Sequence, residues 1–145
     1  LVGCGGGNDI PNMAGAWILR LTPHAPGSAA LLPGVTLGAI FVQTGTHLTG
    51  TVTTVNNQST ACLVGIGAPS TISLSGTLNP VPTGDVPPAN LLLTLTFTSG
   101  SAASDQTISL AGHINKTSHT ITDLYSFPGA GTDCVEGAYT LARAS

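Results

Sequence analysis

The sequence predicts an all-β fold, either an antiparallel β-sandwich or an up-and-down β-barrel of about eight short strands. One observation is compositional: 19 glycines, 10 prolines, 21 threonines and 12 serines in 145 residues leave few strong helix formers outside alanine and leucine. A second is that apolar and polar side chains alternate with a period of two along most of the chain. A third is that turn-rich stretches separate the alternating runs. We therefore expect no α-helix longer than two turns.

The chain length of 145 residues suits one hydrophobic core. Residues 1–14 are expected to form an N-terminal tail or tether, and residues 15–145 a single β domain. The expected strands of the N-terminal half are short runs of β-branched, aliphatic or aromatic residues bounded by turn-forming residues. They cover Ala16–Leu21, Leu37–Thr44, His47–Val55 and Ala61–Val64.

The clearest alternation lies in the C-terminal half. Over Leu91–Ser99, leucine or phenylalanine occupies every second position up to residue 97, which predicts a strand with one buried face. Similar runs begin at Ile72 and Ile108, and two further strands are expected over Thr120–Phe127 and Gly137–Arg143. The side chains expected to point inward are those of Trp17, Ile72, Leu74, Leu93, Leu95, Phe97, Ile108 and Leu110.

A short motif occurs twice inside these strands. Ile72-Ser-Leu-Ser-Gly-Thr-Leu-Asn79 recurs as Ile108-Ser-Leu-Ala-Gly-His-Ile-Asn115, and Leu48–Val52 is a weaker third copy. A glycine inside a strand gives room for a bend, a bulge or a bulky neighbour, so we interpret the repeat as structural. The glycines of the three copies are Gly50, Gly76 and Gly112.

Charged residues are scarce. Three basic and six acidic side chains make up 6% of the chain, against roughly 25% in a typical soluble domain. Three cations cannot neutralise the phosphates of a nucleic acid or form a polybasic membrane-binding stripe, so nucleic acid is excluded as a partner. A surface so poor in charge has little electrostatic repulsion between copies, which favours self-association.

Catalytic and metal-binding signatures are absent from the sequence. It contains no Gly-x-Ser-x-Gly, His-Glu-x-x-His or phosphate-loop pattern. A turn over Asn115–Thr117 would bring His113 opposite His119, as a metal pair requires. Asp123 follows His119 by four residues, and no cysteine completes the set. We therefore expect no enzyme activity, no metal and no cofactor.

The first residues, Leu1-Val2-Gly3-Cys4, match the bacterial lipobox, whose cysteine receives a lipid after export. Gly5–Gly7 would then form a flexible tether between the lipid and the domain. An unmodified tail is the alternative. Cys4 is thus a candidate for lipidation or for an intermolecular contact, and the expected location is the cell surface or the extracellular medium.

Motifs along the rest of the chain extend this interpretation. Cys4–Gly7 is followed by Gly15-Ala16-Trp17, by the strand glycines Gly50 and Gly76, and by a closing Cys-Val-Glu-Gly-Ala-Tyr-Thr run over 134–140. Together they resemble a class of secreted, acidobacterial-type β lipoproteins. The resemblance implies a β domain at or beyond the cell surface and implies no reaction.

Three functions from different classes remain open. The first is a structural or assembly protein, including a filament subunit, in which Val2, Ile10 and Met13 of the tail contact a neighbouring subunit at an open sheet edge. A tail that folds back on its own domain is the alternative to that contact. The second function is lipocalin-like binding of a small ligand, which needs a large apolar cavity. The third is a carbohydrate- or ice-binding surface built on the threonine rows.

With Cys4 in the tail, Cys62 and Cys134 are expected to form a disulfide, and two buried free thiols are the alternative. Closing so long a loop would stabilise the domain by about 4 kcal/mol in the chain-entropy account. Peptide mapping under non-reducing conditions should recover the two cysteine peptides joined. Recovery of both cysteines as free thiols would contradict the expectation.

Overall fold

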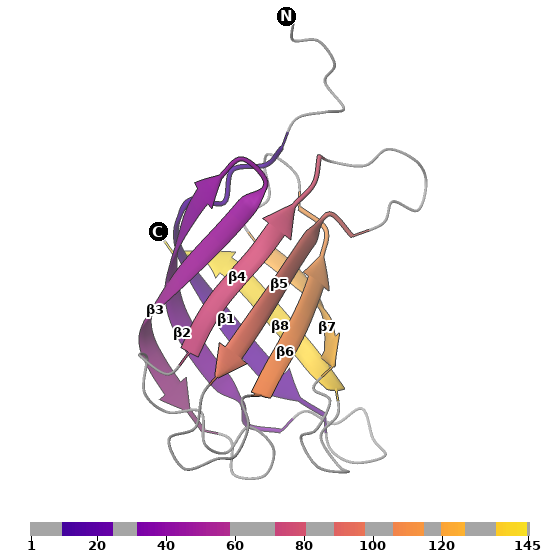
Figure 1. Ribbon diagram of the computed structural model, residues 1–145. Coiled ribbons are helices and arrows are strands. Elements are labelled where there is room, and N and C mark those ends of the chain that lie inside the picture. Colours follow the sequence, from indigo (N-terminus) through magenta and orange to yellow (C-terminus); the bar gives the residue numbers. More distant parts are fainter. Residues whose placement is uncertain are drawn as a thin grey trace, which may run out of the picture.

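The structure, a computed structural model, describes residues 10–24, 32–58, 72–80, 89–97, 106–114, 120–126 and 136–144. Eight antiparallel strands form one closed barrel, in which each strand pairs with the next in sequence and the last returns to the first (Figure 1). The all-β expectation is confirmed, in its barrel form. The strands are β1 (Gly15–Pro23), β2 (Val35–Thr44), β3 (His47–Asn57), β4 (Ile72–Leu78), β5 (Leu91–Phe97), β6 (Gln106–Gly112), β7 (Thr120–Ser126) and β8 (Glu136–Arg143).

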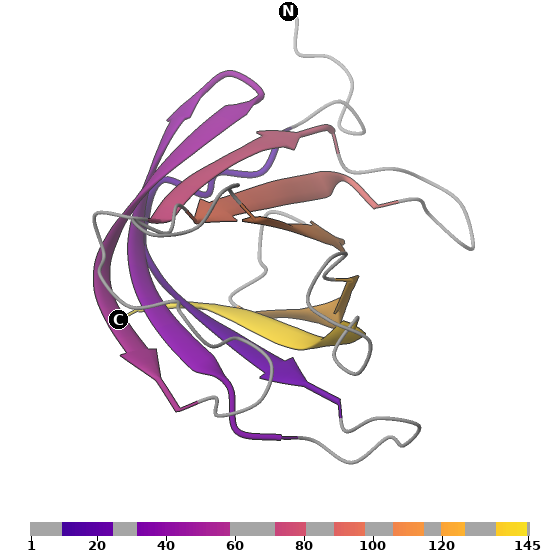
Figure 2. The same cartoon turned by 60° about the horizontal axis from the view of Figure 1, so that its bottom comes forward.

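Closure pairs every described strand on both sides. Figure 2 shows the strands arranged as a ring around one interior, with β4 to β6 facing β8 and β1 across it. The expected strands that fall in the described part of the chain are all observed, with ends that differ by a few residues. The expected strand over Ala61–Val64 lies outside the described residues.

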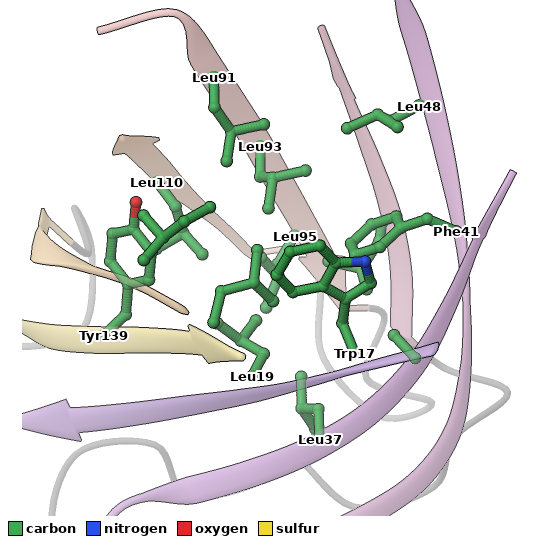
Figure 3. Close-up of a cluster of buried hydrophobic side chains, with 14 of the residues drawn as sticks. Trp17, Leu19, Leu37, Phe41, Leu48, Leu91, Leu93, Leu95, Leu110 and Tyr139 are labelled. Carbon is green, nitrogen blue, oxygen red and sulfur yellow. The ribbon is translucent and has the colours of Figure 1, made fainter. Parts of the chain in front are cut away.

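Inward side chains of the described strands are mostly apolar and form one core inside the barrel. Trp17, Phe41 and Tyr139 are each at most 2% exposed. In Figure 3, Trp17 lies among Leu19, Leu95 and Phe41, which come from three different strands. The side chain of Phe97 lies outside the described part. The other inward residues expected from the alternation are confirmed as buried: Trp17, Ile72, Leu74, Leu93, Leu95, Ile108 and Leu110.

One buried polar side chain joins three strand ends. Asn90, just before β5, is 2% exposed. Its amide nitrogen donates to the Ile114 carbonyl at 2.8 Å, and its amide oxygen accepts from the Ile114 N–H at 2.9 Å. Its backbone carbonyl accepts from the Asn79 N–H at 2.8 Å. These bonds satisfy polar groups that would otherwise be buried at a cost of several kcal/mol (about 1–3 for each group).

The glycines of the repeat stand where an added side chain would clash with a neighbouring strand. A Cβ atom at Gly50 would lie 2.7 Å from the Leu74 Cβ and 2.9 Å from a ring carbon of Phe41. A Cβ at Gly76 would lie 2.6 Å from the backbone oxygen of Leu92 and 2.7 Å from a methyl of Leu93. Each glycine therefore makes room for a bulky neighbour, as the repeat predicted.

Replacement of Gly76 by alanine tests this account. Because the nearest atom to the added methyl belongs to the Leu92 backbone, we expect Gly76→Ala to destabilise the protein by about 1–3 kcal/mol. The matched control is Ser75→Ala, at the neighbouring exposed position, with an expected change within about 0.5 kcal/mol. Urea unfolding measures both. Equal midpoints for the two variants would contradict the steric argument.

Candidate functional site

The segment before β1, residues 10–14, lies across the end of the barrel at which β1 begins; we call this segment the strap. Met13 is completely buried, and Pro11 is buried beside it. Ile10 is partly buried and packs against the core. Asn12, between the two buried residues, is exposed. The strap thus closes one end of the barrel with two apolar side chains.

Gln43, near the end of β2, holds the backbone of the strap with both ends of its amide. The Gln43 Oε1 atom accepts from the Met13 N–H at 2.7 Å, and Nε2 donates to the Pro11 carbonyl at 2.9 Å. The same Nε2 donates to the Gly45 carbonyl at 3.2 Å, in the β2–β3 turn. A single side chain therefore reproduces the donor and acceptor that a neighbouring strand would offer.

Two further side chains complete the attachment. The Trp17 indole Nε1 donates to the Met13 carbonyl at 2.9 Å, and the Arg143 guanidinium donates to the Asn12 carbonyl. The guanidinium also lies over the Trp17 ring, 4.5 Å from its centroid, which is the geometry of a cation–π contact. Residues from β1, β2 and β8 thus converge on three consecutive residues of the strap.

Met13, expected to contact a neighbouring subunit, is buried in its own barrel in this structure, where its side chain removes apolar surface from water. Its contact with a second copy stays a prediction. Ile10 likewise packs against its own core. In this single chain, residues 10–14 fold back on their own domain. Val2, Cys4, Cys62 and Cys134 lie outside the described residues.

Inward side chains of the described strands form one buried apolar cluster inside the barrel. Two hollows, of about 410 and about 360 Å³, are found among the described residues. Both lie on the outer surface of the strands. The larger is lined mainly by outward residues of β3, β4 and β5, and the smaller by residues near the opposite end of β1, β2 and β3.

The outer surface carries an aliphatic face on β8, β1 and β2. Ile18 is 42% exposed, Ile40 47% and Val42 63%. Ile18 pairs with Ala142 of β8, and Ile40 pairs with Ala16 of β1. We define the aliphatic face as these five residues; none of them is charged.

A second face, the hydroxyl face, covers β3 to β6. Cross-strand pairing aligns its outward side chains in two rows. The larger hollow opens beside the first row and also contains the exposed Leu92. The first row is Thr49, Ser75, Thr94 and Ser109, and the second is Thr51, Ser73, Thr96 and Thr107.

Among the described strands, β6 and β7 have the shortest pairing, and we call their boundary the β6–β7 seam. The described pairing consists of Ser109 with Ser126 and Leu110 with Tyr125. The next carbonyl of β6, that of Ala111, accepts from the Tyr139 hydroxyl at 2.8 Å. Gly112 leaves the space for that hydroxyl, because a Cβ there would clash with it. Tyr139, on β8, thus reaches across the interior and satisfies a carbonyl at the seam.

Two described titratable side chains, His113 and Asp123, lie close together near this seam. His113 Nδ1 lies 3.9 Å from a carboxylate oxygen of Asp123, and both side chains are about half exposed (52% and 40%). No cluster of three or more potential metal ligands occurs among the described residues. His119, the partner considered for His113, lies outside them. Within the same part of the chain, no helix has the length and apolarity needed to cross a membrane.

Tyr139 gives the fold a pH dependence. Burial, and to a smaller extent the Asp123 carboxylate, raises the pKa of Tyr139 above its ordinary value. The folded state therefore holds this proton more tightly than the unfolded state, where tyrosine titrates near pH ~10. The stabilisation from the protonated hydroxyl is complete below that pH and is lost as the pH rises above it.

We expect Tyr139→Phe to cost about 1 kcal/mol at neutral pH, because the Ala111 carbonyl loses its donor. Between about pH 9 and about pH 11, the free energy of unfolding should fall more steeply in the unsubstituted protein than in the variant. Urea unfolding across this range measures the difference. Parallel slopes would show that the Tyr139 hydroxyl titrates alike in both states.

Comparison with known proteins supplies no relative: no family model, no curated protein and no solved structure matches the chain. The features from which a function can be inferred are the strap and the two outer faces.

Proposed function

We propose that this protein is a self-assembling structural protein of the cell surface or extracellular medium, in which copies associate through the outside of the barrel. The observation that carries the proposal is the aliphatic face. Three of its side chains, Ile18, Ile40 and Val42, leave about half of their surface in water. Contiguous exposed apolar side chains on a soluble domain are typical of an interaction surface.

Charge supports the same function. The nine charged residues of the chain include only four within the described ranges: Arg20, Asp123, Glu136 and Arg143. Arg143 is engaged with Trp17 and the strap. Little electrostatic repulsion therefore opposes close approach of two copies through the described strands. The lipobox-like start and Cys4 support a location at the cell surface.

Barrel closure affects how such copies can join. An open sheet edge, where a tail from another copy could add a strand, is removed when every strand is paired on both sides. The β6–β7 seam offers less pairing than the other strand pairs, but the Ala111 carbonyl there is already satisfied. Association through a face or through a barrel end is therefore favoured over addition to an edge.

The hydroxyl face favours a second candidate function, binding of a neutral carbohydrate. Its two rows of serine and threonine offer donors and acceptors without charge, and the hollow of about 410 Å³ beside them adds Leu92 and His47. Uncharged polyols are the ligands that such a surface suits.

Ice binding is less favoured because these rows curve around a barrel. Small-ligand binding of the lipocalin kind has no comparable observation in its favour among the described residues, whose inward side chains form a buried apolar cluster.

Val42→Lys tests the assembly function. A lysine at this exposed position places a charge within the aliphatic face, which should abolish or strongly weaken association while changing the free energy of unfolding by less than about 0.5 kcal/mol. Light scattering after size-exclusion chromatography and negative-stain microscopy measure the assemblies.

The matched control is Thr107→Lys, which adds the same charge to an exposed position on β6. This variant should assemble as the unsubstituted protein does. The proposal is wrong if the unsubstituted protein remains monomeric at every concentration, or if Val42→Lys assembles normally.

A further inference from the structure

The contacts between the barrel and the strap have the character of a peptide-binding site. The hydrogen bonds that Gln43, Trp17 and Arg143 donate to the strap all end on backbone carbonyls, those of Pro11, Asn12 and Met13. The Met13 N–H is bonded as well, to the Gln43 Oε1 atom. Three consecutive carbonyls and one N–H are therefore recognised by side chains from three strands. Backbone recognition of this kind accepts an extended peptide from any source.

The same site also buries apolar side chains of the strap. Met13 and Pro11 are buried in it, whereas Asn12 points away from the barrel. The segment that fits is therefore a short extended peptide with apolar first and third residues. In this structure, Pro11–Met13 of the chain itself fills the site.

The strap is held in a way that permits release. Its attachment to the described barrel consists of side-chain hydrogen bonds and apolar contacts, and none of the described backbone–backbone bonds outside the strands involves it. The chain turns from the strap into β1 at residues 14 and 15. The Asn12 side chain accepts from the Ala14 N–H at 3.0 Å, and Gly15 has a φ of 117°, a conformation that glycine alone adopts readily.

We infer that this site also accepts the Pro11–Met13 segment of a second copy, so that copies assemble by exchanging straps. The inference rests on the proposed function and names how the copies are joined. An exchanged strap makes the same contacts as a strap in its own barrel, so the change between the two states is small and depends on the turn at Gly15 and on concentration. Exchange in one direction, from each copy to the next, produces an open chain of subunits.

The position of the aliphatic face supports exchange. Val42 directly precedes Gln43 in β2, and Ala16 follows the Gly15 turn in β1. The aliphatic face therefore borders the strap site. A neighbouring copy that inserts its strap arrives beside these exposed apolar side chains, which it can cover.

Two full-length variants separate the donor from the receiver. Met13→Asp removes the apolar anchor of the donated strap but leaves the site intact, whereas Gln43→Ala impairs the site but leaves the strap intact. We expect each variant alone to be monomeric. An equal mixture of the two should give a heterodimer with twice the monomer mass in native mass spectrometry, because one competent strap meets one competent site.

Met13→Leu is the conservative control and should assemble as the unsubstituted protein does. Far-UV circular dichroism and Trp17 emission establish that the variants are folded before they are mixed. Absence of the heterodimer from folded variants, or normal assembly by each variant alone, overturns the inference.

Gly15→Ala provides a test that leaves the core and the site unchanged. A Cβ at Gly15 would meet no atom within 4 Å, so the substitution acts only through the positive φ of the turn. Strain in the folded-back strap should shift the population towards exchanged assemblies at a given protein concentration. An unchanged or smaller assembled fraction contradicts strap exchange.

The outcomes distinguish this inference from the proposed function on which it rests. If the unsubstituted protein does not associate, both fail. If association is lost in Val42→Lys but persists in Met13→Asp, the aliphatic face joins the copies without exchange, and the inference alone fails.

Discussion

Closure of the sheet around a small interior is the constraint on which the rest of the structure depends. Because β8 pairs with β1, every inward side chain competes with side chains from the far wall for a limited volume. Phe41 and Tyr139 fit because Gly50 and Gly112 stand beside them. Gly50 thus makes room for Phe41, and Gly112 makes room for Tyr139. A larger residue at either glycine would require a smaller residue at its aromatic neighbour.

Closure also determines which parts of the molecule are available to contact other molecules. A barrel whose strands are paired on both sides exposes its outer walls and its ends but few unpaired backbone groups. On the walls, one side is aliphatic and the other is rich in hydroxyl groups, and neither carries a row of charges. At the end that the strap covers, Gln43 and Arg143 supply the polar contacts that a paired strand would otherwise make.

The strands and their buried faces could be predicted because alternation is a local signal. Leu93 and Leu95 are buried and Leu92 is half exposed, as a period of two requires. The choice between sandwich and barrel could not be predicted, since closure depends on how the first and last strands meet. In β2, apolar residues occupy both faces, so the pattern did not distinguish the exposed Ile40 and Val42 from buried residues. The hydrogen bond between Met13 and Gln43 joins residues far apart in the sequence, and no sequence pattern predicts it.

Pairing of β1 with β8 has a consequence for how the protein is made. Trp17 of the first strand pairs with Arg143 of the last strand, so the barrel cannot close until all eight strands have been synthesised. Before then, the growing chain presents alternating apolar strands with open edges, and long-range pairing of this kind folds slowly. Such a delay would help a protein that must cross a membrane before it folds. Until β1 pairs with β8, the chain remains unfolded enough to pass through an export channel.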